Sequence, residues 1–189
     1  MFLHLDCRHY LGDRPCKFNR LCENCPHYAP MRPRTPIIKL GSLGDVVRTA
    51  CLLPGLAALP DAPHVTWLTS AAARPLVERM PGVDRVLTFD PLTLRHLAVE
   101  RFDTIMSLDK EPGPCSLAMS LRADRRLGIG LSRYGTVFPL NEECDPYFTL
   151  GLVDELKFHH NTKTYPQLIY EAMGIDYAGQ DYRLSPTDA

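Results

Sequence analysis

Short apolar runs alternate with stretches of helical periodicity along the chain from Ile37 onward. Apolar runs of about four to eight residues are typical of buried strands, and longer periodic stretches are typical of helices that pack through one face. Strands are expected at 36–40, 64–69, 83–89, 103–108 and 126–131, and helices at 46–59, 71–80, 92–100, 115–121 and 165–173. This alternation predicts an α/β domain with a Rossmann-like parallel sheet flanked by helices.

Glycine and proline refine two of the expected helices. Pro54 and Gly55 interrupt the periodicity of 46–59, so a break is expected there. Gly174 follows the helix at 165–173, and glycine is well suited to the left-handed position after a helix end.

The loops that follow the strands are expected to share one edge of the sheet. Right-handed crossovers place these loops together, and ligands of open α/β sheets bind outside this carboxyl edge. The segments expected there are 41–45, 69–70, Asp90 and 109–110. The pattern therefore predicts a binding site at this edge, but it does not give the order of the strands.

The loop after the first strand, KLGSLGD at 39–45, is the most informative segment. Gly41 and Gly44 allow a sharp turn and a close approach of the backbone to a ligand. The following helix directs free N–H groups and a positive dipole end at this point, which suits a phosphate or a carboxylate. Asp45 then lies at the helix start, where it can act as a base or serve as an ordinary N-cap. The loop matches neither GxGxxG nor the Walker pattern, so the residues alone leave both roles open.

A different composition precedes this domain. Residues 1–30 contain few aliphatic side chains, and a proline-rich linker at 31–36 separates them from the domain at 37–189. The segment has four cysteines in the pattern C-x8-C-x5-C-x2-C: Cys7, Cys16, Cys22 and Cys25. Four thiolates suit a structural Zn²⁺, whose binding would supply folding energy that this segment cannot gain from burial. An iron–sulfur cluster is the alternative cofactor, and free thiols, a redox pair or disulfides remain open.

Charge and hydropathy exclude several classes of protein. The formal net charge is -1 with no basic block, which argues against a nucleic-acid partner. The sequence lacks an apolar run of the roughly 18 residues that a membrane-spanning helix needs, and its start does not resemble a signal peptide. A cytoplasmic location with reduced thiols is therefore expected.

The segment IIKLGSLGDVVRTA at 37–50 is similar to the opening of glycosyltransferase family 9, the ADP-heptose:lipopolysaccharide heptosyltransferases. The likeness continues in the same order through 60–69, 83–86, 102–106 and 126–130. This resemblance implies a GT-B fold, in which two Rossmann-like domains face each other across a cleft. Residues 37–189 would be the N-terminal, acceptor-side domain. The C-terminal domain that binds the nucleotide sugar is not recognisable here, so the chain alone is expected to be incomplete and inactive.

The resemblance also implies roles for particular residues. Family members invert the anomeric centre without a catalytic metal, and the Asp of their SxGD loop is regarded as the general base. That Asp maps onto Asp45, which would take the proton of an acceptor hydroxyl as its oxygen attacks the heptose. Candidate substrate contacts around it are Lys39, Gly41, Ser42, Gly44, Arg48 and Lys110, with Asp109 as a lesser candidate.

The implied reaction moves heptose from ADP-heptose to a lipid A–Kdo or core-oligosaccharide acceptor in the lipopolysaccharide inner core. Peripheral contact with the inner face of the inner membrane would follow from such an acceptor. The alternative is a non-catalytic zinc-knuckle α/β module that binds an anionic ligand or a partner protein. An NAD-binding enzyme is a poor match, because the glycine spacing is wrong and the second strand ends at Thr69 without an acidic residue.

Overall fold

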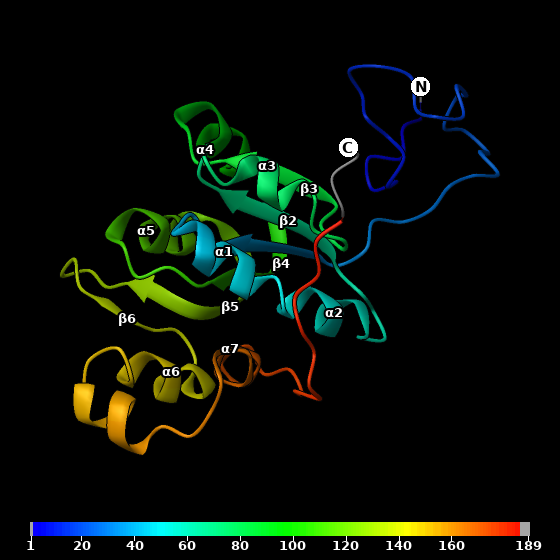
Figure 1. Ribbon diagram of the computed structural model, residues 1–189. Helices are drawn as coiled ribbons and strands as arrows, with labels where there is room; N and C mark the ends of the chain where they lie inside the picture. The colour runs from blue at the N-terminus through cyan, green and yellow to red at the C-terminus, as the bar shows by residue number, and fades with distance from the viewer. Residues whose placement is uncertain (1, 186–189) are drawn as a thin grey trace.

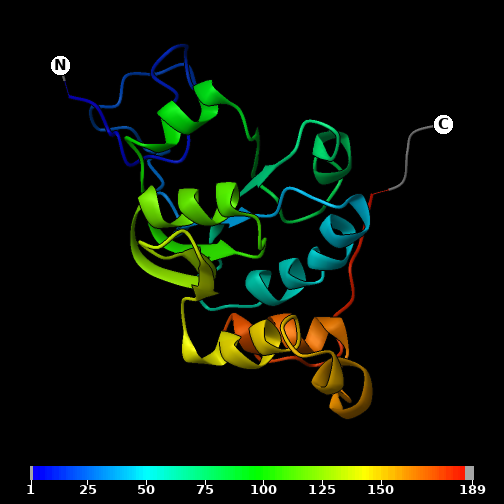
Figure 2. The ribbon, with the colours of Figure 1, turned by 90° about the vertical axis from the view of Figure 1, so that its left-hand side faces the viewer.

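Within residues 2–185, which the computed structural model describes, a six-stranded sheet lies between two layers of helices (Figures 1 and 2). The strands lie in the order β3-β2-β1-β4-β5-β6; the first five of these are parallel, and β6 is antiparallel to β5. Their bounds are β1 Arg34–Ile38, β2 His64–Thr69, β3 Arg85–Thr88, β4 Arg101–Ser107, β5 Arg122–Leu131 and β6 Val137–Pro139. The expected parallel α/β sheet is confirmed, with an antiparallel edge strand that the sequence did not predict.

The helices cover both faces of this sheet. Their bounds are α1 Leu43–Thr49, α2 Leu52–Ala57, α3 Arg74–Val77, α4 Pro91–Leu97, α5 Pro112–Ser120, α6 Asp145–Thr149 and α7 Tyr165–Ala172, with a 3-10 turn at Glu142–Cys144 and a π-helical turn at Leu156–His160. Successive side chains of a strand point to opposite faces. Ile37 and Trp67 accordingly pack in the cluster that holds α1, α2, α3 and α7, whereas Ile38 and Leu68 pack with α4 and α5.

The expected helix at 46–59 is in fact two helices. The first ends at Thr49 and the second begins at Leu52, so the break precedes Pro54 and the prediction of a break at Pro54 was wrong. Pro54 lies in the first turn of α2, where the missing N–H removes no intrahelical hydrogen bond.

Other boundaries differ as well: the strand expected at 126–131 begins at Arg122, and the helix expected at 71–80 is only α3, Arg74–Val77. The second strand, at 64–69, is confirmed at both ends. The first strand begins at Arg34 and ends at Ile38, so the last residues of the expected linker lie in β1. Gly174 has a φ of +64°, which confirms the left-handed residue expected after α7.

Gly55 packs directly against Tyr170 of α7. The fully buried Tyr170 hydroxyl accepts a hydrogen bond from the Gly55 N–H at 3.1 Å and donates one to the Cys51 carbonyl at 2.5 Å. Burial raises the pKa of Tyr170 to about 12, so it remains a neutral phenol. This contact joins α2 to α7 across one face of the sheet.

We expect Gly55→Ala to lower the free energy of unfolding by about 1–3 kcal/mol, the usual effect of overpacking. A Cβ at this position would lie 2.5 Å from Tyr170 Cε1, so the ring must shift away from its two hydrogen-bond partners. Urea unfolding measures the change. Gly113→Ala in α5 is the matched control, because its Cβ would lie 3.6 Å from Phe89 in ordinary contact. Equal stability of the two variants would contradict the packing described.

Residues 2–30 form an irregular lobe at the amino ends of the strands (Figure 1). The two ends of this lobe are held together by an isolated antiparallel bridge between Cys7 and Pro30. The Arg8 N–H donates to the Ala29 carbonyl at 2.9 Å on one side of the bridge. The lobe is thus a closed loop that lies at the edge of the sheet opposite the carboxyl edge.

Candidate functional site

The loop after β1 and the residues after β4 meet where the strand order reverses. Lys39 Nζ donates to Asp109 Oδ1 at 2.6 Å, and the Leu40 N–H donates to Asp109 Oδ2 at 2.5 Å. The two charged side chains are only 8% and 1% exposed. Burial raises the pKa of Asp109, whereas the Lys39 ammonium and the Leu40 N–H oppose that rise. This buried pair links the loop after β1 to the residues after β4. Lys39 therefore holds the loop in position and is not itself exposed to a ligand.

Asp45 lies in the first turn of α1, at the carboxyl edge of the sheet; this part of the edge is called the mouth below. Ser42 is the N-cap residue of α1, so Asp45 is the third residue of the helix and not its cap. The Asp45 carboxylate accepts hydrogen bonds from Arg48 and, at 3.4 Å, from the Ser42 hydroxyl. Its side chain is 35% exposed, which leaves it accessible to a ligand.

The surroundings of Asp45 keep it ionised. Partial burial acts to raise the pKa of Asp45, but the hydrogen bond from Arg48 and the positive charges of Lys39 and Arg48 outweigh burial. The pKa consequently lies below its ordinary value. At neutral pH the group is a carboxylate that can accept a proton.

Two tyrosines that the sequence analysis missed complete the mouth. The Arg48 guanidinium lies over the Tyr165 ring, 4.5 Å from its centroid. The Tyr165 hydroxyl is 3.0 Å from Thr49 Oγ1, and the Tyr147 ring packs against Tyr165 edge-to-face at 6.2 Å. Burial raises the pKa of both phenols, so both are neutral.

A local signal for Tyr165 was present in the sequence. Thr164 caps α7, and the Gln167 side-chain oxygen accepts a hydrogen bond from the Thr164 N–H at 2.8 Å, which is the capping-box pattern T-x-x-Q. This pattern fixes Tyr165 as the first residue of α7. It does not reveal that α7 packs against α1, so the link to Arg48 required the structure.

Lys110 provides a second cation beside the tyrosines. Its ammonium lies 5.5 Å from the Tyr147 ring centroid and 5.4 Å from that of Phe148. The residue is exposed, and partial desolvation lowers the pKa of its ammonium. Lys39 is buried against Asp109, whereas Arg48 is exposed even though it pairs with Asp45, and Lys110 is exposed as well. Of the three predicted contact cations, Arg48 and Lys110 are therefore the ones accessible from solvent.

The two loop glycines border open space. A Cβ built at Gly41 or at Gly44 would have no neighbour within 4 Å among the described residues. Neither residue has the positive φ that would by itself demand glycine. Glycine at these two positions leaves room above the loop, as close approach of a ligand requires.

Gly44→Ala should separate folding from binding. The position lies within α1, so alanine should raise the free energy of unfolding by about 0.5–1 kcal/mol. The same methyl group projects into the open space and should weaken binding of an anionic ligand over the loop. Thermal unfolding and calorimetric titration of the variant measure the two effects. A variant that binds as tightly as the wild type would place the ligand elsewhere.

The remaining carboxylate expected at this edge, Asp90, has a structural role. It is the N-cap of α4 and accepts hydrogen bonds from the N–H groups of Leu92 and Thr93. The Thr88 hydroxyl and these N–H groups lower the pKa of Asp90 to about 2. Its partners are Thr88 at the end of β3 and the first residues of α4, so its role is to hold this strand-to-helix turn.

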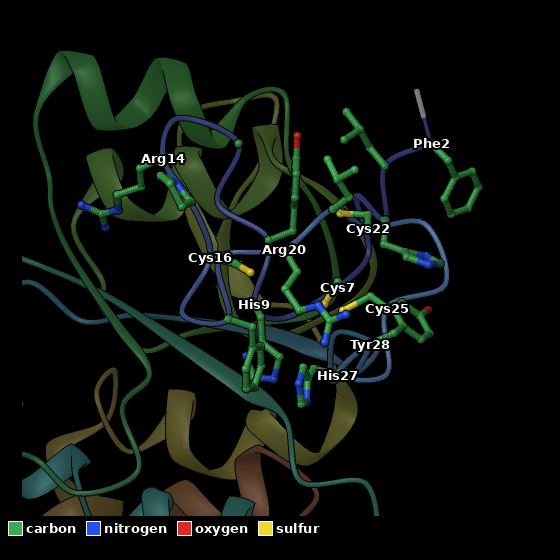
Figure 3. Close-up of a pocket in the computed structure, with 17 residues that line it drawn as sticks. Phe2, Cys7, His9, Arg14, Cys16, Arg20, Cys22, Cys25, His27 and Tyr28 are labelled. Atoms are coloured by element: carbon green, nitrogen blue, oxygen red, sulfur yellow. The ribbon is translucent and has the colours of Figure 1, made fainter.

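The four predicted metal-ligating cysteines lie outside this site. Cys7, Cys16, Cys22 and Cys25 are free thiols that line one pocket in the amino-terminal lobe (Figure 3). Within residues 2–185, no set of three or more His, Cys, Asp or Glu side chains is grouped around a single ion position. The expected zinc therefore stays a prediction.

Solved structures with the same architecture include two glycosyltransferases. The glycosyl transferase family 9 protein of Veillonella parvula DSM 2008 aligns over 77% of this chain and 42% of its own, with a TM-score of 0.56 and 17% identity. The E. coli heptosyltransferase WaaC with ADP-2-deoxy-2-fluoro heptose aligns over 78% of this chain and 50% of its own, with a TM-score of 0.51 and 14% identity. The chain has the fold found in glycosyltransferase family 9.

This family 9 fold is a structural finding, since identities below a fifth show architecture alone. No family model matches the sequence, and no curated protein matches it. The chain spans half or less of the two structures it aligns with. In the part that the structure describes, every helix is too short or too polar to cross a bilayer.

Proposed function

We propose that this chain is the acceptor-side domain of an inverting glycosyltransferase that transfers heptose from ADP-heptose to the lipopolysaccharide inner core. The observation that carries the proposal is the ionised, accessible carboxylate of Asp45 at the switch point of a family 9 fold. Open space over Gly41 and Gly44 lies beside this carboxylate, as an acceptor hydroxyl would need.

In the proposed reaction Asp45 acts as the general base. It takes the proton of an acceptor hydroxyl while that oxygen attacks the anomeric carbon of the heptose. The bond between this carbon and the diphosphate breaks as the new one forms, so a single displacement inverts the configuration. ADP leaves with the electron pair of the broken bond. The donor would be held by a nucleotide-sugar domain beyond this chain, as in the GT-B arrangement.

Arg48 and Lys110 are proposed to bind the anionic groups of the acceptor, such as the carboxylate of Kdo. Charge-assisted hydrogen bonds from these cations would orient the acceptor over the loop. An acceptor carboxylate would also draw Arg48 away from Asp45. Because Arg48 lowers the pKa of Asp45, this exchange would make Asp45 a stronger base when the acceptor is in place.

The acceptor lipid sets the place of the reaction. A lipid A–Kdo molecule is anchored in the bilayer, so we place the enzyme at the cytoplasmic face of the inner membrane. Contact with the membrane would be peripheral and made through the acceptor.

A transfer assay with the product of the complete reading frame tests this function. ADP-heptose and lipid A–Kdo should give a heptosylated product whose new glycosidic bond has the configuration opposite to that of the donor. ADP-glucose serves as the donor control and should give no product. Binding of the acceptor without any transfer, by a well-folded protein, would instead support the non-catalytic binding module.

Arg48→Gln should shift the pH dependence of transfer. The active form requires ionised Asp45, and Arg48 lowers the pKa of that carboxyl. Removing the guanidinium raises this pKa, so the acid limb of the kcat/KM profile moves to higher pH. Arg74→Gln is the control, since its exposed pair with Glu78 lies in α3. An acid limb that stays in place in Arg48→Gln would assign the base to another group.

A further inference from the structure

The amino-terminal lobe has a site that the transfer reaction does not use. A pocket of about 270 Å³ is lined by all four cysteines of the lobe, by His4, His9 and His27, and by aromatic and aliphatic side chains (Figure 3). Arg14 and Arg20 also line it, whereas its described lining includes no carboxylate. The lining therefore combines four soft ligands with positive charge.

Each of the four cysteines opens a tight turn. The carbonyl of every one accepts a hydrogen bond from the N–H group three residues later, at 2.9 to 3.2 Å. The four turns are Cys7–Tyr10, Cys16–Asn19, Cys22–Cys25 and Cys25–Tyr28. Asn19 and Asn24 have positive φ values of 47° and 53°, a backbone conformation that asparagine tolerates in turns. The backbone is thus folded around the four thiols.

The lobe has almost no apolar core of its own. Among its described residues, Cys7 is the one buried hydrophobic side chain, while Leu5, Leu11 and Leu21 are exposed. Aromatic contacts such as the stacking of Phe18 on His27 at 3.9 Å hold its interior. A segment of this size needs additional stabilisation, such as a bound metal, to stay folded.

The spread of the thiols distinguishes two kinds of cofactor. A single Zn²⁺ with Zn–S bonds of about 2.3 Å draws four sulfurs to about 3.8 Å from one another and leaves no cavity between them. In an iron–sulfur cubane each thiolate binds a different iron, and the cluster itself fills the space between the thiolates. All four cysteines line one cavity of about 270 Å³, which a single ion would not fill and a cluster would, so the pocket matches the second arrangement.

We infer that Cys7, Cys16, Cys22 and Cys25 hold a [4Fe–4S] cluster that forms the folding core of the amino-terminal lobe. A cubane with four thiolates carries net negative charge, which Arg14 and Arg20 complement. The lobe lies at the edge of the sheet opposite the start of α1 (Figure 1), so the cluster stabilises the lobe and does not contact the transferred sugar.

Anaerobic purification of the full chain, followed by reconstitution with iron and sulfide in the presence of equimolar zinc, tests this inference. We expect about four iron and four acid-labile sulfide per chain, with the broad visible absorption of sulfide-to-iron charge transfer. One zinc ion per chain without that absorption would replace the cluster by a single-ion site. A chain that retains neither metal would also overturn the proposal.

Two cysteine variants locate the cluster. Cys25→Ala should lose the absorption and most of the iron. Cys51→Ala, which removes a buried thiol from the sheet domain, should keep both. Far-UV circular dichroism checks that the sheet domain of each variant is folded. Equal iron in the two variants would show that the metal is not bound by the lobe.

Discussion

Asp45→Asn is expected to lower kcat for heptose transfer by at least about 100-fold, the usual contribution of a general base. The substitution keeps the size of the side chain and removes its ability to accept a proton. Binding of the acceptor should change little, because in our account Arg48 and Lys110 make the anionic contacts. The assay compares kcat with the dissociation constant of the acceptor for the same protein.

Asp90→Asn is the matched control for this variant. It makes the same substitution at the same edge of the sheet, in a residue whose partners are Thr88 and the first residues of α4. Asparagine is also a good N-cap, so both stability and transfer should remain near the wild type. If Asp45→Asn transferred heptose as fast as Asp90→Asn does, Asp45 would not be the base.

Lys39→Met should be the most destabilising change at the site, with a loss of about 3–5 kcal/mol in the free energy of unfolding. It leaves the Asp109 carboxylate 1% exposed without its cation. The variant should recover part of this loss as the pH falls. Burial already raises the pKa of Asp109, and loss of the ammonium raises it further, so protonation at lower pH relieves the unpaired charge.

Urea unfolding at several pH values measures the effect of Lys39→Met. Lys163→Met is the control, because Lys163 forms an exposed pair with Glu171 whose removal should cost about 0–1 kcal/mol. A similar small loss in both variants, independent of pH, would show that the buried pair does not support the loop.

The sheet was largely predictable because its strands are short apolar runs between polar loops. The second strand, at 64–69, was bounded correctly because β-branched and aromatic residues are concentrated in it between Pro63 and Ser70. The order of the strands was not predictable, since it depends on which helices pack on which face. The chain between 132 and 163 gave no usable pattern, because its helical turns are too short to show periodicity.

The contacts of the candidate site were likewise predictable only where they are local in the sequence. Asp45 and Arg48 are three residues apart on one helix, so their proximity follows from the sequence. The partner of Lys39 could not be found in this way, because its contact with Asp109 requires that β1 and β4 be neighbours. Tyr165 contacts Thr49 from 116 residues away along the chain, and local patterns do not predict such a contact.

The most direct test of the acceptor site is NMR mapping of a soluble Kdo-bearing glucosamine disaccharide on the isotopically labelled chain. Our account predicts shifts of the backbone signals of residues 41–48, Lys110 and Tyr165, with the amino-terminal lobe unaffected. Arg48→Gln should weaken the binding that produces these shifts. Shifts confined to other parts of the chain, or none at saturating disaccharide, would contradict the assignment of this edge as the acceptor site.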